Sequence, residues 1–179
     1  MNENSIIIES LRPYLSVVKK WIIDYVEENK PEAKNVSEFG FSRLPYYYPK
    51  KILDTAKVVI VDKVIMIPLS QLGIQGFDDF ENLDAAGVTY LNTYFVSRKY
   101  ANLESIHFHE LVHISQWYYL GIDTFLLLYG LGLKKYGYKL SPLEAQAYKL
   151  QECFEKSIDH FDVELQIISS LKHTIKENF

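Results

Sequence analysis

The first part of the chain carries apolar residues at the spacing of one helix face. Between Ile6 and Val26 they recur every three or four positions, which is the period of an amphipathic α-helix. Pro13 lies inside this stretch, and a helix tolerates proline in its first turn but not in its interior. We therefore expect the long helix to begin at Pro13 after a short helical turn and to end in the polar run Glu27–Pro31.

Three later segments have the pattern of β-strands. Lys57–Val61 and Val64–Pro68 are rich in β-branched residues and are separated only by Asp62 and Lys63, which predicts an antiparallel hairpin. Val88–Ser97 alternates and is rich in strand-forming residues, which predicts one further strand.

Two segments around these strands follow neither period. Gly40–Lys51 contains two prolines and the run Tyr46–Tyr48, which indicates an ordered loop packed by its aromatic side chains. Ser70–Asn82 is polar and contains glycine, so we expect a loop with about one helical turn.

The remainder of the chain has a helical period and predicts four helices. The first begins at Asn102 or Leu103 and runs to Leu120, where Gly121 stops it. The others are Ile122–Lys135, Pro142–Asp159 and Asp162–Glu177.

A chain of 179 residues is long enough for one domain with a hydrophobic core. It shows no internal repeat and no linker, so we expect a single α+β domain in which a small antiparallel sheet packs on one side of a mostly helical body. Residues 1–55 would supply the N-terminal helix and the aromatic loop, residues 56–98 the sheet, and residues 99–179 the helical part.

Composition narrows the classes of function. The formal net charge of −4 argues against a nucleic-acid binder, because such proteins carry a basic surplus. Cys153 is the one cysteine, which excludes an internal disulfide and a cysteine-based zinc site. The first residues lack the pattern of a signal peptide, and no apolar stretch reaches the length of a membrane span. We expect a cytoplasmic protein without a nucleic-acid or membrane partner; its oligomeric state is left open.

The segment Ser105–Trp117 carries the candidate chemistry. His109 and His113 are four residues apart, so a helix places both imidazoles on one face within reach of a single metal ion. Glu110 follows the first histidine on a neighbouring face, where it can hydrogen-bond a water on that metal. The spacing predicts a zinc site with His109 and His113 as ligands.

A third ligand is needed, because a catalytic zinc usually has three protein ligands and one open position. Glu144 lies 31 residues after His113 in a predicted helix and can supply it. The same glutamate also completes a capping box with Ser141, in which it bonds the N-cap amide instead. Asp123 is a further candidate, although we prefer it as the N-cap of its own helix.

The other polar residues near this segment have less defined roles. His107 lies on roughly the opposite side of the helix from the pair, so it is not expected to be a ligand. His160 and His173 are expected to be structural residues outside the site. Gln116 lies on the face of the pair, where it can support the ligands or only cap a polar pocket.

The run His-Glu-Leu-Val-His-x-x-Gln-Trp at 109–117, followed by Pro-Leu-Glu-Ala-Gln-Ala-Tyr at 142–148, resembles the zincin metallopeptidases of the gluzincin type. It is most similar to small bacterial families of predicted metallopeptidases whose function is unknown. The resemblance extends from Val88 to about Phe154. It implies a zincin-like active-site helix and a zinc ion bound by His109, His113 and Glu144.

The same resemblance implies the chemistry of a peptidase that acts on a peptide or protein. Glu110 would be the general base for a zinc-activated water, and Val88–Val96 would be the edge strand that aligns an extended peptide. Gluzincins also use a residue that stabilises the oxyanion, for which Tyr148 is the first candidate and Tyr94 the second. The alternative is a zinc-binding protein that is non-catalytic or latent and acts through a partner.

Overall fold

The structure is a computed structural model that describes residues 2–156 and 160–178. Its α-helices are α1 (Glu3–Leu11), α2 (Leu15–Asn29), α3 (Lys50–Thr55), α4 (Asp78–Glu81), α5 (Glu104–Tyr136), α6 (Pro142–Lys156) and α7 (Val163–Asn178). Its strands are β1 (Lys34–Asn35), β2 (Lys57–Val61), β3 (Gly87–Tyr90) and β4 (Thr93–Ser97). Short 3-10 helices are η1 (Arg12–Tyr14), η2 (Lys30–Glu32), η3 (Val36–Phe39) and η4 (Leu44–Tyr46).

The fold is α+β, with a four-stranded sheet beside a mostly helical body. The strand order is β1-β2-β4-β3, and β2 runs parallel to β4 while the other pairs are antiparallel. The sheet is therefore mixed, and our prediction of an antiparallel sheet is wrong in this respect. Parallel pairing of β2 with β4 needs a crossover, which the segment between β2 and β3 and the strand β3 provide.

The predicted hairpin of Lys57–Val61 with Val64–Pro68 does not form. The first segment is β2, but the second has no strand structure, and the neighbours of β2 are β1 and β4. The connecting Asp62 and Lys63 include no glycine, and two-residue hairpin turns favour residues that accept positive φ. With both edges of β2 already paired, residues 64–68 instead run outside the sheet.

The predicted strand Val88–Ser97 is two strands. β3 and β4 form an antiparallel hairpin, in which Tyr90 pairs with Thr93. The chain reverses at Leu91, whose φ of 61° lies in the left-handed region that non-glycine residues rarely adopt. Asn92 is the one typical turn residue at this reversal and no glycine accompanies it, so the alternating pattern continued across it. β3 ends up at the edge of the sheet.

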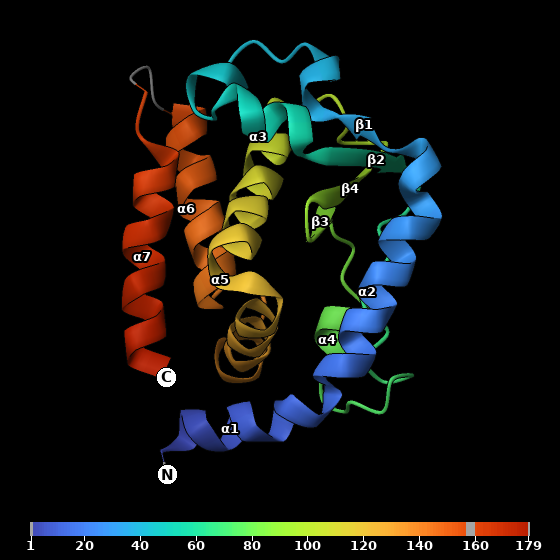
Figure 1. Cartoon of the computed structure of the whole chain (residues 1–179), viewed down its shortest axis with the longest axis vertical. Coiled ribbons are helices and arrows are strands. Elements are labelled where there is room, and N and C mark those ends of the chain that lie inside the picture. Colours follow the sequence, from blue (N-terminus) through green and yellow to red (C-terminus); the bar gives the residue numbers. More distant parts are fainter. Residues whose placement is uncertain (1, 157–159, 179) are drawn as a thin grey trace.

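The N-terminal stripe forms the long helix close to its predicted start at Pro13, and the segment before it is a second helix, α1, instead of a short helical turn. α1 is nine residues long, and α2 begins two residues after Pro13, with η1 between them. Figure 1 shows that α1 lies across the end of the molecule while α2 runs along the sheet. Pro13 cannot donate a backbone hydrogen bond, which favours a change of direction at this point.

Helices cover both faces of the sheet, whereas we expected them on one side. In Figure 1 the sheet lies between α2 and the helical body of α5, α6 and α7. Trp21 and Tyr25 of α2 contact the ring of Tyr90 at centroid distances of 5.6 and 5.9 Å. On the opposite face, Tyr94 contacts His107 of α5. Successive residues of a strand point to opposite faces, so Thr89 and Tyr94 face α5.

The aromatic loop is ordered, as predicted, and the unpredicted helix α3 begins at its end. Tyr47 and Tyr48 are buried, while Tyr46 is exposed. In the second segment without a regular period, residues 70–82, α4 is the one expected helical turn.

The predicted helices after residue 102 are formed. α5 contains a break at Gly121, with φ of 70°, so it consists of two helices that meet where we predicted a stop. α6 begins at Pro142, and the predicted end at Asp159 lies outside the described residues. α7 covers nearly the predicted range. No helix in the described ranges combines the length and the apolar character needed to cross a membrane.

Candidate metal centre

The candidate site lies where the first half of α5 meets α6 and β3. His109 and His113 lie one helical turn apart on the same face of α5, and each residue is 5% exposed. Glu144 is in the first turn of α6 and is 2% exposed. Burial holds these side chains in single orientations, which a metal site requires because its ligands must not move.

The three side chains converge on one point. The Nε2 atoms of His109 and His113 are 3.1 Å apart. Glu144 Oε1 lies 3.4 Å from Nε2 of His113, and its Oε2 lies 3.5 Å from Nε2 of His109. One ligand atom from each residue lies within 4.8 Å of the others, so the structure brings together the three residues that the sequence suggested.

The tautomer of each histidine follows from its other ring nitrogen. His113 Nδ1 lies 2.7 Å from Gln116 Oε1, and the amide nitrogen of Gln116 donates to the Leu143 carbonyl, which can only accept. The oxygen of Gln116 must therefore face His113, and Nδ1 of His113 carries the hydrogen. Nε2 of His113 thus presents a lone pair to the cluster when the ring is neutral.

Gln151 fixes His109 in the same way. His109 Nδ1 lies 3.0 Å from Gln151 Oε1, while the amide nitrogen of Gln151 donates to a carboxylate oxygen of Glu155. Nδ1 of His109 is therefore the donor, and its Nε2 lone pair also points at Glu144. Gln151 lies seven residues after Glu144, so both side chains leave the same face of α6.

Glu144 does not form the capping box that we considered as an alternative. Its Oε1 accepts a hydrogen bond from the Tyr129 hydroxyl at 2.7 Å, and its Oε2 is buried without a hydrogen-bond partner among the described residues. The Ser141 amide donates to the carbonyls of Gly137 and Tyr138 instead, and Ser141 Oγ also lacks a partner. The carboxylate is therefore directed at the histidine pair and leaves the helix N-terminus uncapped.

The charges of the cluster stabilise one another. Burial disfavours the ionised form of Glu144, but His113 and His109 outweigh this effect and hold the pKa of Glu144 well below its usual range. Burial likewise disfavours the imidazolium of His113, but the Glu144 carboxylate raises its pKa to about 9. Two lone pairs and a carboxylate in a dry interior need a positive charge among them, either a proton or a metal ion.

Glu110 lies beside this cluster, on the side of α5 that faces β3. Its Oε2 accepts a hydrogen bond from Thr89 Oγ1 at 2.7 Å. A Cβ atom added to Gly87 would lie 2.5 Å from Glu110 Oε1, so only glycine at this position of β3 leaves room for the carboxylate. Burial raises the pKa of Glu110 above its ordinary value, although His109 and His113 act in the opposite direction.

A small cavity connects Glu110 with the metal-ligand candidates. Its volume is about 30 Å³, and its lining includes Glu110, His113 and Glu144. This volume accommodates about one or two water molecules and no peptide. The space beside the cluster is therefore too small to admit a peptide substrate in this structure.

The tyrosine candidates occupy different positions from those we expected. The Tyr148 ring contacts the His109 ring at 4.7 Å, and the side chain is 38% exposed and outside the cavity lining. Tyr138, which we did not predict, does line the cavity. Tyr94 donates to His107 Nδ1 at 2.7 Å and does not reach the cluster.

The remaining candidates lie outside the cluster. His107 is buried between the Tyr94 hydroxyl and the Ala101 carbonyl, and burial lowers its pKa. Asp123 pairs with Lys19 at 2.7 Å on the surface. His160 stacks on Tyr46, and His173 is an exposed residue of α7.

Comparison of the chain with models of known protein families, with curated proteins and with solved structures finds no match. The resemblance to gluzincins therefore rests on the residues of the two segments 109–117 and 142–148 alone.

Replacing Gln151 by leucine is expected to weaken zinc binding by about 10–100-fold, which is typical for the loss of a group that orients a metal ligand. Without the Gln151 oxygen, the Nδ1 hydrogen of His109 loses its acceptor and the ring is free to turn. Competition with a fluorescent zinc chelator measures the affinity. Gln166→Leu, an exposed change on α7, is the matched control and should keep the affinity of the unchanged protein. Equal affinities for the two variants would show that Gln151 does not orient the ligand.

Proposed function

We propose that this protein is a zinc-dependent metallopeptidase in which His109, His113 and Glu144 bind the zinc ion. The observation that carries the proposal is the convergence of two imidazole lone pairs on a buried carboxylate whose Oε2 has no hydrogen-bond partner. The resemblance of residues 109–117 and 142–148 to gluzincins supports a metal ion rather than a proton at this point.

The spacing of the three side chains fits a zinc ion. Tetrahedral zinc with bonds of about 2.0–2.1 Å keeps its ligand atoms about 3.3–3.4 Å apart. The two Nε2 atoms are 3.1 Å apart, His113 Nε2 lies 3.4 Å from Oε1 of Glu144, and His109 Nε2 lies 3.5 Å from Oε2. With one ligand atom taken from each residue, all three lie within 4.8 Å of one another. Two imidazoles and a carboxylate are a donor set that zinc accepts, and three protein ligands leave the fourth position for a water or a substrate.

When bound, zinc supplies a Lewis acid that lowers the pKa of a water towards about 7 and polarises a substrate carbonyl. Glu110 is then the general base, because its carboxylate lines the same cavity as His113 and Glu144 and is held by Thr89. It accepts a proton from the attacking water and returns it to the leaving amine. Tyr138, which lines the same cavity, is the best placed donor for the oxyanion.

The choice of a peptide as substrate rests on β3. It is an edge strand directly beside Glu110, and an extended peptide can pair with such an edge. One carbonyl of β3, that of Thr89, already accepts a hydrogen bond from the Trp117 indole. Because backbone groups of a strand point alternately to its neighbour and outward, peptide pairing would use the Thr89 amide and the backbone groups of Gly87.

A second candidate function is favoured by the closure of the site. His109, Glu110, His113 and Glu144 are each at most 5% exposed, and the cavity beside them admits no peptide. The protein can therefore be a latent or non-catalytic zinc-binding protein that acts through a partner. Both candidates share the zinc ion and differ only in turnover.

An assay of peptide cleavage distinguishes the two candidates. The purified full chain is loaded with one equivalent of zinc and incubated with a mixture of unstructured peptides, and new amino termini are measured. A metallopeptidase is expected to generate termini, to stop when a chelator removes the zinc and to recover when zinc is restored. Stoichiometric zinc without new termini would favour the latent protein, and absence of zinc binding would contradict both candidates.

A further inference from the structure

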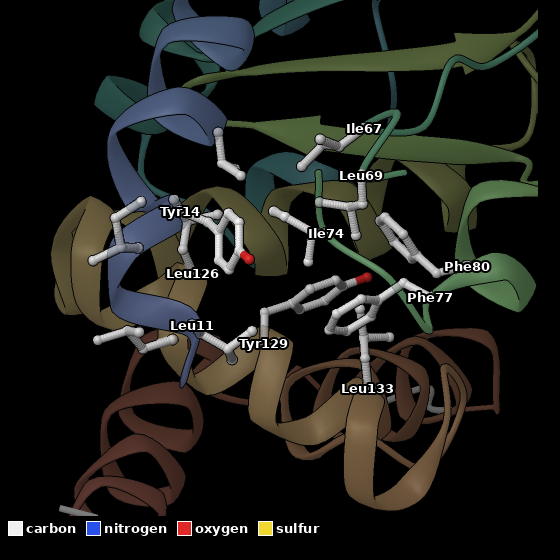
Figure 2. Close-up of a pocket in the computed structure, with 14 residues that line it drawn as sticks. Leu11, Tyr14, Ile67, Leu69, Ile74, Phe77, Phe80, Leu126, Tyr129 and Leu133 are labelled. Carbon is white, nitrogen blue, oxygen red and sulfur yellow. The ribbon is translucent and has the colours of Figure 1, made fainter. Parts of the chain in front are cut away.

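The three candidate ligands are held by different parts of the fold. Glu144 is held by the hydroxyl of Tyr129, whose ring lies among the apolar side chains drawn in Figure 2. His109 is held by Gln151, which is on α6 together with Glu144. The groups that hold His113 lead away from the cluster to α7, which lies beside α6 on the outer side of the helical body (Figure 1). No part of the chemistry described above uses α7.

A chain of two side-chain amides connects His113 with α7. Nδ1 of His113 lies 2.7 Å from Oε1 of Gln116. Nε2 of Gln116 donates to Oε1 of Gln146 at 2.8 Å. Nε2 of Gln146 in turn donates to the backbone carbonyls of Gln166 and Ile167, at 3.3 and 3.4 Å. The chain of hydrogen bonds therefore runs without a gap from a ligand candidate to the backbone of α7.

The carbonyls of α7 fix the direction of this chain. A backbone carbonyl can only accept, so Gln146 presents its amide nitrogen to α7 and its oxygen to Gln116. Gln116 is fully buried, and its amide nitrogen donates to the Leu143 carbonyl as well as to Gln146. Its oxygen is left for His113, whose Nε2 lone pair then points at the cluster. Hydrogen bonds that all donate in one direction strengthen one another, so each link supports the next.

α7 packs on the body of the fold through one apolar stripe. Within the described part of the helix, the buried side chains recur every four residues and are Val163, Ile167 and Leu171. The polar contacts of its first half include the hydrogen bond from the Tyr119 hydroxyl to the Glu164 carboxylate and those from Gln146. A helix of 16 residues with so narrow a buried stripe opens locally at a lower cost in free energy than the core does. When it opens, Gln146 loses its acceptors.

We infer that Gln146 is a positioning residue for His113 and that it couples the docking of α7 to metal binding. The inference rests on the proposed zinc site and adds a means of regulating it. Docked α7 holds Gln146, which holds Gln116, which keeps the lone pair of His113 on the ion. Coupling of this kind is reciprocal, so zinc must stabilise the docking of α7 by the same factor by which docked α7 strengthens zinc binding. Capture of α7 by a partner would then weaken zinc binding.

The first test replaces Gln146 by methionine, which has a similar length but forms neither of the two links. Zinc affinity, measured by competition with a fluorescent chelator, is expected to fall about tenfold. This is the lower end of the range for loss of an outer group, because the Leu143 carbonyl still holds Gln116. Gln166→Met is the control, since it makes the same change at an exposed position of α7 and keeps the backbone carbonyl that Gln146 contacts. Its zinc affinity should equal that of the unchanged protein.

A second measurement needs no variant and separates positioning from a merely structural role. Amide hydrogen exchange of the unchanged full chain is followed with and without saturating zinc. Exchange in α7 should slow about tenfold with zinc, the same factor as the loss of affinity in Gln146→Met. α1, which packs on the second half of α5, is the internal reference and should slow less. In Gln146→Met, zinc should slow α7 no more than α1, whereas a variant that only loses packing would keep the difference.

The outcomes distinguish this inference from the proposed function. Equal zinc affinities of Gln146→Met and Gln166→Met would overturn the inference while the zinc site stands. The same holds if zinc binds to the unchanged protein but slows exchange in α7 no more than in α1. Failure of the chain to bind zinc would overturn the proposed function and this inference together.

Discussion

Glu110→Gln is expected to keep its zinc and to lose peptide hydrolysis by a factor of about 10²–10⁴, the range that general acid–base catalysis contributes. Glutamine has nearly the shape of glutamate and can still accept the hydrogen bond from Thr89 Oγ1. It cannot take a proton from water, so the loss should fall on kcat. Initial rates with a peptide that the unchanged protein cleaves provide the measurement.

Zinc content is the internal control for this variant. Glu110 is not one of the three converging residues, so Glu110→Gln should bind zinc with the affinity of the unchanged protein. Hydrolysis that survives at full zinc occupancy would show that Glu110 is not the base. Loss of zinc from the variant would instead place Glu110 among the ligands.

Glu144→Ala is expected to weaken zinc binding by more than the factor of about 10–100 expected for Gln151→Leu. The reason is that Glu144 supplies a ligand atom, whereas Gln151 only orients one. Binding to the folded chain alone stabilises it, and zinc at 1,000 times its Kd contributes about 4 kcal/mol. For a chain of this size the Tm should rise by roughly 8–16 °C with zinc, and Glu144→Ala should lose most of this rise.

Glu152→Ala is the matched control on the same helix. Glu152 is exposed and pairs with Lys156, so its removal should leave the zinc-dependent rise of Tm intact. A full rise in Glu144→Ala would mean that Glu144 is not a ligand and that two histidines alone hold the ion. The comparison uses thermal unfolding with and without zinc at one protein concentration.

Local signals in the sequence were sufficient for the helical part of the fold and for the ligand candidates. The approach of His109 to His113 depends on two residues one helical turn apart, and the break in the helix depends on Gly121 itself. Both features are formed as expected. Glu144 could be placed near the pair only as one of two alternatives, because Ser141 also suggested a capping box. The structure shows that the box is not formed.

The sheet could not be predicted in the same way. Pairing of β2 with β4 joins residues more than 30 positions apart, and nothing in either segment specifies a parallel partner. The reversal at Leu91 and Asn92 has no glycine, and Leu91 itself takes the positive φ, whose cost the packing of β3 and β4 around it offsets.

The residues around the ligands were mostly missed for a related reason. Thr89, Tyr129 and Tyr138 reach the site from β3, from the second half of α5 and from the turn before α6. Their roles depend on how these elements meet in space, which no local pattern reveals. Gln151 is an exception, since its position two turns after Glu144 on one helix face was a usable signal.

Zinc titration of the purified full chain, combined with X-ray absorption at the zinc edge, tests the central claim most directly. We predict one zinc ion per chain, bound by two imidazole nitrogens at about 2.0–2.1 Å and by carboxylate or water oxygen at about 2.0–2.2 Å. The His113→Ala variant should lose this ion. A chain that binds no zinc, or a zinc signal that is unchanged in His113→Ala, would contradict the claim that His109, His113 and Glu144 form a metal site.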